Sequence, residues 1–209
     1  MPIMPLRLFA ESDRRNAYIA RALLIAALMG YNFFISEWMQ VEFHYTPLLT
    51  GCAFFPMTIT TFIGAIKVPA LICRYGNKRV LTFGFILLVL GFCCLLLSDK
   101  NSTYLYGIGI PMIFIGFGQG LAMSPLTNLG LINVEHKDAG AASGLVNISH
   151  QIGGALGLST MVAASNGMDN ISDRFHTGMI VALICIILAL CCFTISWIKH
   201  ISIHKKYII

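Results

Sequence analysis

Six long apolar runs dominate the 209-residue sequence, at about residues 17–41, 49–72, 79–97, 104–131, 139–164 and 176–198. An α-helix needs about 20 mostly apolar residues to cross the roughly 30 Å hydrocarbon core of a bilayer. Hydrocarbon offers no hydrogen-bond partners, so each segment must satisfy its own backbone groups, as a helix does. None of the runs shows the short alternating pattern of a barrel strand. The sequence therefore predicts an all-α membrane protein with six transmembrane helices.

The scarcity of charge excludes other classes of protein. Asp, Glu, Lys and Arg make up 11% of the residues, against about 25% in an average soluble domain. Such a chain could not cover its own surface in water. The formal charge of +5 is spread over short breaks between the runs, whereas a nucleic-acid reader gathers basic residues on one face. We therefore expect the lipid bilayer, and no nucleic acid, as a partner.

The positions of the basic residues predict an orientation. If successive breaks lie on alternate sides, one side holds ten Lys and Arg residues: Arg7, Arg14, Arg15, Arg74, Lys78, Arg79, Lys137, Lys199, Lys205 and Lys206. The other side holds Lys100 and Arg174, while Arg21 and Lys67 lie inside runs. Because cytoplasmic loops are rich in Lys and Arg, we expect both termini in the cytoplasm. The predicted organisation is a cytoplasmic segment at 1–16, a bundle over 17–198 and a basic cytoplasmic tail at 199–209.

Motifs of common enzyme and metal sites are missing from the sequence. It contains no HExxH, GxxxxGK[ST], GxSxG or CxxC pattern, and its seven Cys lie mostly inside apolar runs. His200 and His204 are spaced i, i+4, but they stand in the basic tail, where a solvated segment is the favoured interpretation. We therefore predict no catalytic residue, no metal and no cofactor.

The runs differ in character. The third and sixth are bulky and uniform, which favours contact with lipid, whereas the fourth and fifth contain GxxxG patterns at 116–120 and 140–144. Such spacing lets membrane helices approach closely. Pro56, Pro69, Pro111 and Pro125 lie within runs, where proline is expected to bend a helix. Bent, glycine-rich helices fit a transporter, and they also fit a tightly packed bundle without a cavity.

Polar side chains inside the fifth run share one face. Asn147, His150 and Gln151 follow helical spacing, and Ser143 continues this face one turn earlier. They could line a path for substrate or protons, or they could form a hydrogen-bond seam between helices. His150, with an ordinary pKa of about 6.5, is a candidate for a proton relay.

Two further polar residues lie in other runs. Gln119, near the middle of the fourth run, could bond a ligand or the fifth helix. Glu37 is the only acid inside the six runs and lies about 6 Å from the outer end of the first. It is either an interfacial acid beside Trp38 or a carboxylate that binds a proton. Lys67 is expected to extend to the nearby interface.

Three stretches resemble exporters of the major facilitator superfamily, of the 14-spanner drug/proton antiporter type. They are residues 44–57, residues 115–125 and, most specifically, residues 138–157 with the sequence DAGAASGLVNISHQIGGALG. The last is similar to the family pattern AG-x-ASGL-x-N followed by RQ-x-GGALG, with His150 where the family often has Arg. The loop RYGNKR at 74–79 resembles a basic cytoplasmic loop of the superfamily. There, Arg74, Gly76, Lys78 and Arg79 would belong to the latch of the inward-facing gate.

This resemblance implies that the six helices form one major-facilitator six-helix bundle, the C-terminal half of a proton-coupled multidrug efflux antiporter in the plasma (inner) membrane. Such antiporters work by alternating access between two bundles. The implied substrates are small hydrophobic or cationic molecules, exchanged for protons, and the implied partner is an N-terminal half or a second copy. The residues expected on the substrate path are Asn147, Gln151, Gln119 and Ser143, with His150 and Glu37 as proton-responsive candidates. A truncated or split-gene product that does not transport alone is the alternative.

Overall fold

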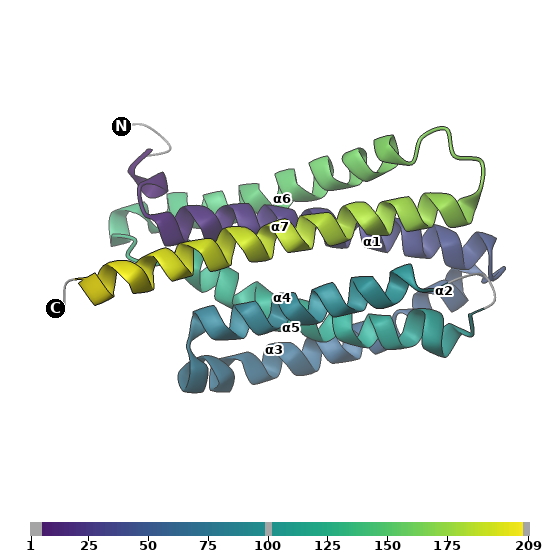
Figure 1. The fold of residues 1–209 in the computed structure, drawn as a ribbon, viewed down its shortest axis with the longest axis horizontal. Helices are drawn as coiled ribbons and strands as arrows, with labels where there is room; N and C mark the ends of the chain where they lie inside the picture. The colour runs from purple at the N-terminus through teal and green to yellow at the C-terminus, as the bar shows by residue number, and fades with distance from the viewer. Residues whose placement is uncertain (1–5, 99–101, 207–209) are drawn as a thin grey trace.

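The computed structural model describes residues 6–98 and 102–206, with side chains described as far as residue 194. All regular elements in these ranges are helices (Figure 1). They are η1 (Leu6–Phe9), α1 (Ser12–Val41), α2 (Pro47–Ala53), α3 (Phe55–Tyr75), α4 (Asn77–Leu96), η2 (Leu105–Gly109), α5 (Ile110–Gly130), η3 (His136–Asp138), α6 (Ala139–Ala164) and α7 (Ile171–Lys206). Each predicted run thus corresponds to one helix or to two consecutive ones.

Five helical segments among the described residues are long and apolar enough to cross a bilayer: Ser12–Val41, Pro47–Tyr75, Asn77–Leu96, Leu105–Gly130 and Ile171–Thr194. The helix α6 is not among them, although it has 26 residues. Its Ser, Asn, His and Gln side chains lower its apolar character. The predicted membrane-spanning helices are therefore confirmed as candidates for five of the six runs, and α6 as the sixth stays a prediction.

Two predicted boundaries differ from those in the structure. The helix α1 begins at Ser12, inside the predicted segment 1–16, because its first turn finds partners within the protein. Asp13, for example, pairs with Lys78 at 2.6 Å. The helix α7 continues through Lys206 into the predicted tail 199–209, since polar residues such as Lys are good helix formers outside a membrane. The side chains of His200 and His204 lie outside the described residues.

Only two of the four prolines within the predicted runs lie in the interior of a helix, beyond its first turn. Pro69 is inside α3 and Pro125 inside α5, whereas Pro56 and Pro111 stand in the first turns of α3 and α5. Pro56 has no N–H to continue the preceding helix, so α2 and α3 are separate. Pro111 likewise leaves the Gly107 carbonyl without its helical donor, and the buried Ser98 hydroxyl donates to that carbonyl at 2.7 Å.

The helices form two groups of three. Figure 1 shows α6, α1 and α7 along one side of the bundle and α4, α5 and α3 along the other. The groups meet where α4 packs on α7 and α1 on α5. At this junction Tyr31 of α1 lies edge-on to Phe92 of α4 with ring centroids 5.8 Å apart, and within the first group Trp38 of α1 stacks on Phe175 of α7 at 4.3 Å. One buried apolar core therefore joins all the long helices.

Glycines bring α5 close to two neighbours. A Cβ at Gly116 or Gly120 would lie 2.3–2.4 Å from backbone carbonyl oxygens of α3, and one at Gly118 would lie 2.7 Å from the Gly84 carbonyl oxygen of α4. The close approach predicted for the GxxxG pattern at 116–120 is confirmed. The same prediction for 140–144 is wrong, because Gly140 and Gly144 have nothing within 4 Å of a Cβ position.

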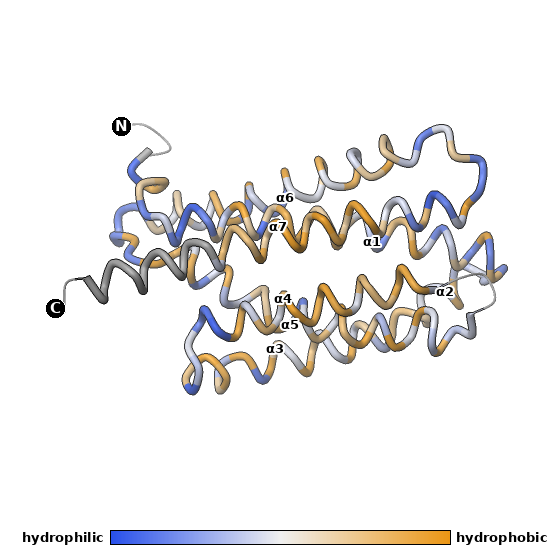
Figure 2. Tube along the Cα trace, in the orientation of Figure 1, coloured by the Kyte–Doolittle hydropathy of each residue, from blue (hydrophilic) through white to orange (hydrophobic). Residues whose placement is uncertain are grey.

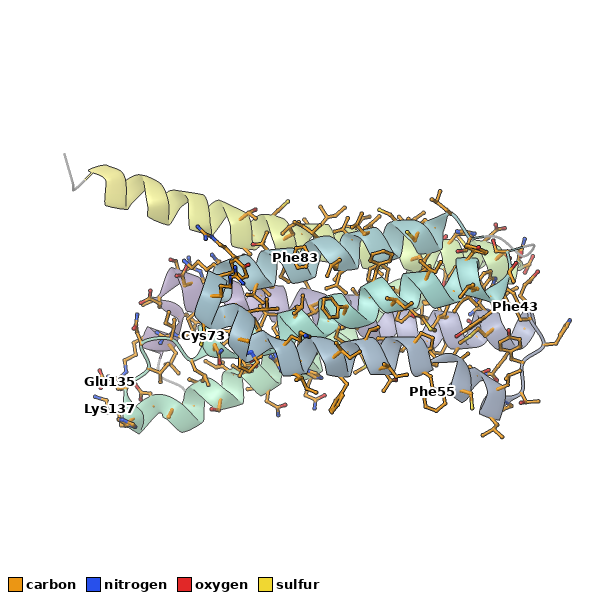
Figure 3. All side chains as sticks on the ribbon, turned by 90° about the horizontal axis from the view of Figure 1, so that it is seen from below. Phe43, Phe55, Cys73, Phe83, Glu135 and Lys137 are labelled. Carbon is orange, nitrogen blue, oxygen red and sulfur yellow. The ribbon has the colours of Figure 1, made fainter. Side chains whose placement is uncertain are left out.

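Polar residues gather at the ends of the bundle, and apolar residues fill its middle (Figure 2). Figure 3 shows Cys73, Glu135 and Lys137 at one end, and Phe43 and Phe55 at the other. The first end, where α1 begins, also carries Arg74 and Arg79; we refer to it as the basic end. The outer faces of α4 and α7 expose large apolar side chains such as Phe83 and Ile184, as expected of helices in contact with lipid.

Candidate functional site

The helix α6 packs against α1 through small residues. Gly153 and Gly157 leave no room for a Cβ, because Ala22 and Ala26 of α1 lie 2.3 Å from its position. One turn after Gly157, the Met161 side chain lies over Gly30 of α1. This spacing of four residues on both helices is the small-residue contact by which membrane helices pack closely. By the register of these contacts, residues 150–161 of α6 lie level with the apolar part of α1, whereas Ser143 and Asn147 lie level with its first turns.

A polar stripe runs along the exposed side of α6. Ser143, Asn147 and Gln151 are all exposed and stand four residues apart, so they share one face. Among the described residues, none of these three side chains forms a hydrogen bond to another helix. The predicted alternative of a hydrogen-bond seam is therefore wrong within this chain. We use the term polar stripe for these three residues.

An apolar stripe lies next to the polar one. It consists of large exposed side chains: Ile148 (47% exposed), Ile152 (52%) and Leu156 (62%). Each of these residues comes one residue after a position on the polar face, so its side chain points about 100° further around the helix. Beside this stripe a groove of about 230 Å³ is lined mostly by apolar residues of α1, α6 and α7. The apolar stripe suits lipid. The polar stripe does not, because an amide in hydrocarbon costs free energy unless it is hydrogen-bonded.

His150 lies within electrostatic range of Arg21, a basic residue inside the first apolar run. Arg21 of α1 is partly buried, and its Nη1 donates to Thr127 Oγ1 of α5 at 2.9 Å. Its Nε is buried without an acceptor. His150 is also partly buried. A signal was present in the sequence, because Arg21 and Lys67 are the only Lys or Arg residues inside the apolar runs apart from Arg79, which stands at the first position of the third run.

Glu37 is paired at the end of the bundle opposite the basic end. Its Oε1 lies 3.1 Å from Arg174 Nη1 of α7. Its Oε2 is buried and meets no hydrogen-bond donor in the part of the chain that the structure describes. A hollow of about 500 Å³ adjoins this carboxylate, and its lining includes the polar side chains of Asn32, Ser36 and Gln40. Glu37 is thus a partly covered acid with one free oxygen and one ion-pair partner.

Gln119 is separate from the polar stripe. The side chain is partly buried, and its Oε1 has no hydrogen-bond donor. No hydrogen bond joins it to α6 among the described residues. It shares one side of α5 with Met123 and Thr127 by its spacing of four and eight residues. The structure therefore joins Arg21 to Thr127, with His150 within electrostatic range of Arg21, whereas Gln119 and Glu37 lie apart from these residues along the bundle.

The loop between α3 and α4 is tied to the rest of the basic end. Gly76 has φ 82° and ψ 157°, a conformation that favours glycine. Lys78 Nζ pairs with the buried Asp13 of α1 at 2.6 Å, while the Arg74 guanidinium lies 5.2 Å from the Tyr75 ring centroid. Arg79 is exposed. Of the four predicted gate residues, Lys78 makes the contact that links α4 to α1.

A second set of contacts fastens the segment before α1 to α6. Arg7 pairs with Asp138, the residue before α6, at 2.7 Å. This hydrogen-bonded contact raises the pKa of Arg7 above its ordinary value. Arg14 is buried and donates to the carbonyls of Leu8 at 2.6 Å and Ile132 at 3.1 Å. The start of α6 is therefore held at a defined position against α1.

Residues 3–158 match the family model of the Major Facilitator Superfamily. This chain belongs to the major facilitator superfamily. The match ends within α6 and includes all of the polar stripe. Membership of this superfamily, together with the long apolar helices, shows that the chain is an integral membrane protein.

Relatives of the chain carry names of drug resistance or export. The chain is 30% identical over 169 residues to the puromycin resistance protein pur8 of Streptomyces alboniger, covering 79% of this chain and 34% of that protein. It is 33% identical over 165 residues to the cephamycin export protein CmcT of Amycolatopsis lactamdurans, covering 78% and 34%. Identity to the multidrug resistance protein Stp of Mycobacterium tuberculosis is 27% over 160 residues, covering 77% and 29%. The chain thus spans about a third of the length of these relatives.

Proposed function

We propose that this chain forms the C-terminal six-helix bundle of a proton-coupled exporter of the 14-spanner type. The exporter removes antibiotics and other small hydrophobic or cationic molecules from the cell by alternating access. The names of the relatives support the substrate class. The second bundle is an N-terminal half or a second copy of the chain, and substrate passes between the two.

The exposed polar stripe of α6 is the observation that carries this proposal. Ser143, Asn147 and Gln151 face away from the helices of their own chain, beside an apolar stripe that suits lipid. Gln151 is level with the apolar part of α1, and polar groups at membrane depth usually face the interior of a bundle or water. A substrate path between two bundles supplies that environment. Gln119 contributes to the same path from α5.

The proton-responsive part is assigned to Glu37 and His150. Glu37 has a free carboxylate oxygen next to a hollow with polar lining. A proton on this carboxylate would weaken its ion pair with Arg174 and so loosen the contact between α1 and α7. His150 lies next to the polar stripe, where its charge would act on substrate directly.

We assign the basic end of the bundle to the cytoplasmic side. We assign the chain to the plasma (inner) membrane. Cytoplasmic loops are rich in Lys and Arg. Arg74, Gly76, Lys78 and Arg79 then form part of the latch of the inward-facing gate. The contact from Lys78 to Asp13 supports this role, because its rupture would free α4 from α1 at that end.

The test is ethidium efflux from cells that lack their own pumps. The 209-residue chain is expressed alone and together with an N-terminal half of the family, and insertion is verified in both cases. We expect efflux in the presence of the partner. In that background, Asn147→Leu with Gln151→Leu should lower the efflux rate at least tenfold. The matched control, Ile148→Leu with Ile152→Leu, changes the neighbouring stripe and should leave the rate unchanged.

Other outcomes would contradict parts of the proposal. If the chain alone gives equal efflux, the second bundle is another copy of the chain and not an N-terminal half. An inserted chain that is silent with and without the partner would contradict the exporter itself. Efflux that is indifferent to the loss of Asn147 and Gln151 would remove the polar stripe from the path.

A further inference from the structure

We infer that Arg21 binds the carboxylate of a transported molecule, so that acidic and zwitterionic compounds belong to the substrate class. This inference rests on the proposed function for the identity of the ligand as a substrate. It extends that function, because it assigns a residue that recognises an acidic group, which the proposed path does not otherwise contain. The site consists of Arg21 on α1, Thr127 on α5 and His150 on α6.

The charge of Arg21 has no counterpart in the described structure. The four ion pairs there join Arg7 to Asp138, Lys78 to Asp13, Lys137 to Glu135 and Arg174 to Glu37. The neighbouring helices α5 and α6 contain no Asp or Glu. On α1 itself, Asp13 is paired with Lys78, and Glu37 lies 16 residues further on, about 24 Å along the helix. A cation without a counter-ion inside an apolar run is a candidate for a functional site.

The guanidinium group is held in place but keeps most of its donors free. Thr127 donates its hydroxyl hydrogen to the Met123 carbonyl at 3.1 Å, so its oxygen is oriented to accept from Arg21 Nη1. Arg has five N–H donors, and this is the one hydrogen bond that Arg21 makes within the described residues. Planar guanidinium donors match the two oxygens of a carboxylate. An anion with two acceptor oxygens is therefore the ligand that fits.

The position of Arg21 connects it to the polar stripe. His150 lies within electrostatic range of Arg21 and adds a ring nitrogen as a further hydrogen-bonding group. On α6, His150 stands between Asn147 and Gln151 in the sequence, within one helical turn of both. A molecule whose carboxylate binds Arg21 would thus lie near the amides of these two residues.

Extension of Arg21 to the nearby interface is the simplest competing interpretation. Arg21 lies four residues, about 6 Å, from the start of the apolar run at residue 17. A side chain that extends into water would have its nitrogens hydrated. Here Nε is buried and Nη1 is bonded to α5. The contacts hold the guanidinium inside the bundle.

Binding of ciprofloxacin and of its methyl ester to the purified 209-residue chain tests this inference. The two probes differ in one carboxylate, and their own fluorescence reports binding through anisotropy. We expect the wild type to bind the acid at least tenfold more tightly than the ester. Arg21→Gln should abolish this preference and leave ester binding unchanged, which also shows that the variant is folded. Arg21→Lys should retain part of the preference, and Arg15→Gln, an exposed arginine on the same helix, all of it.

Three results would overturn the inference. The first is a wild type that does not prefer the acid, and the second is an Arg21→Gln variant that loses both probes equally. The third is an Arg21→Gln variant that binds both probes as the wild type does but no longer associates with an N-terminal half. Arg21 would then bind a carboxylate of the partner protein. An acid preference without efflux would refute the proposed function alone, whereas efflux without an acid preference would refute only this inference.

Discussion

Arg14 illustrates how single residues hold the basic end together. It is 6% exposed, and its guanidinium donates to main-chain carbonyls of Leu8 and Ile132. These carbonyls lie outside the long helices, so no helical N–H satisfies them. A buried carbonyl without a donor costs free energy. Arg14 therefore fastens the segment before α1 and the end of α5 to the start of α1.

We predict that Arg14→Ala destabilises the protein by about 2–3 kcal/mol, the range for the loss of hydrogen bonds from a charged donor to buried acceptors. Thermal unfolding of the purified chain in detergent measures this loss. The matched control is Arg15→Ala, because Arg15 is exposed and, among the described residues, donates only to the Phe9 carbonyl. Equal unfolding temperatures for the two variants would show that Arg14 has no special role.

The helix α6 has one covered face and other faces that are exposed. The covered face packs on α1 through glycines, and the exposed faces carry the polar and apolar stripes. The sequence contains several pairs of small residues four apart in this helix, and we predicted that the pair at 140–144 makes the close contact. The pair at 153 and 157 makes it instead. Spacing alone could not decide this, since both pairs satisfy the same pattern and only the neighbouring helix distinguishes them.

Substitution of these glycines tests the contact between α1 and α6. In Gly153→Leu, the Cβ would lie 2.3 Å from the Ala22 carbonyl oxygen, which is backbone and cannot move aside cheaply. We expect a loss of several kcal/mol of stability or a failure to accumulate in the membrane. Gly144→Leu is the control on the same helix, because nothing lies within 4 Å of its Cβ position. Thermal unfolding and the amount of inserted protein are the measurements, and equal tolerance of both changes would contradict this packing.

Over the whole molecule, the sequence predicted the helices better than their contacts. The apolar runs correspond to α1, α2 with α3, α4, η2 with α5, α6 and α7, because bilayer thickness and backbone hydrogen bonding dictate helices of this length. The ion pair between Glu37 and Arg174 was not predicted, since it joins residues far apart in the chain. Arg21 was missed for the same reason. Its role depends on Thr127 and His150, which only the packing of α1, α5 and α6 brings near.

The assignment of the polar stripe to a water-filled path is the central claim, and cysteine labelling tests it most directly. Asn147→Cys and Ile148→Cys place a thiol on adjacent residues, about 100° apart around α6. Each is introduced after the seven native cysteines are replaced, and membranes containing the chain with an N-terminal half are treated with a membrane-impermeant maleimide. We predict that position 147 is labelled and position 148 is not. Labelling of 148 but not of 147, or of neither, would contradict a water-filled path along α6.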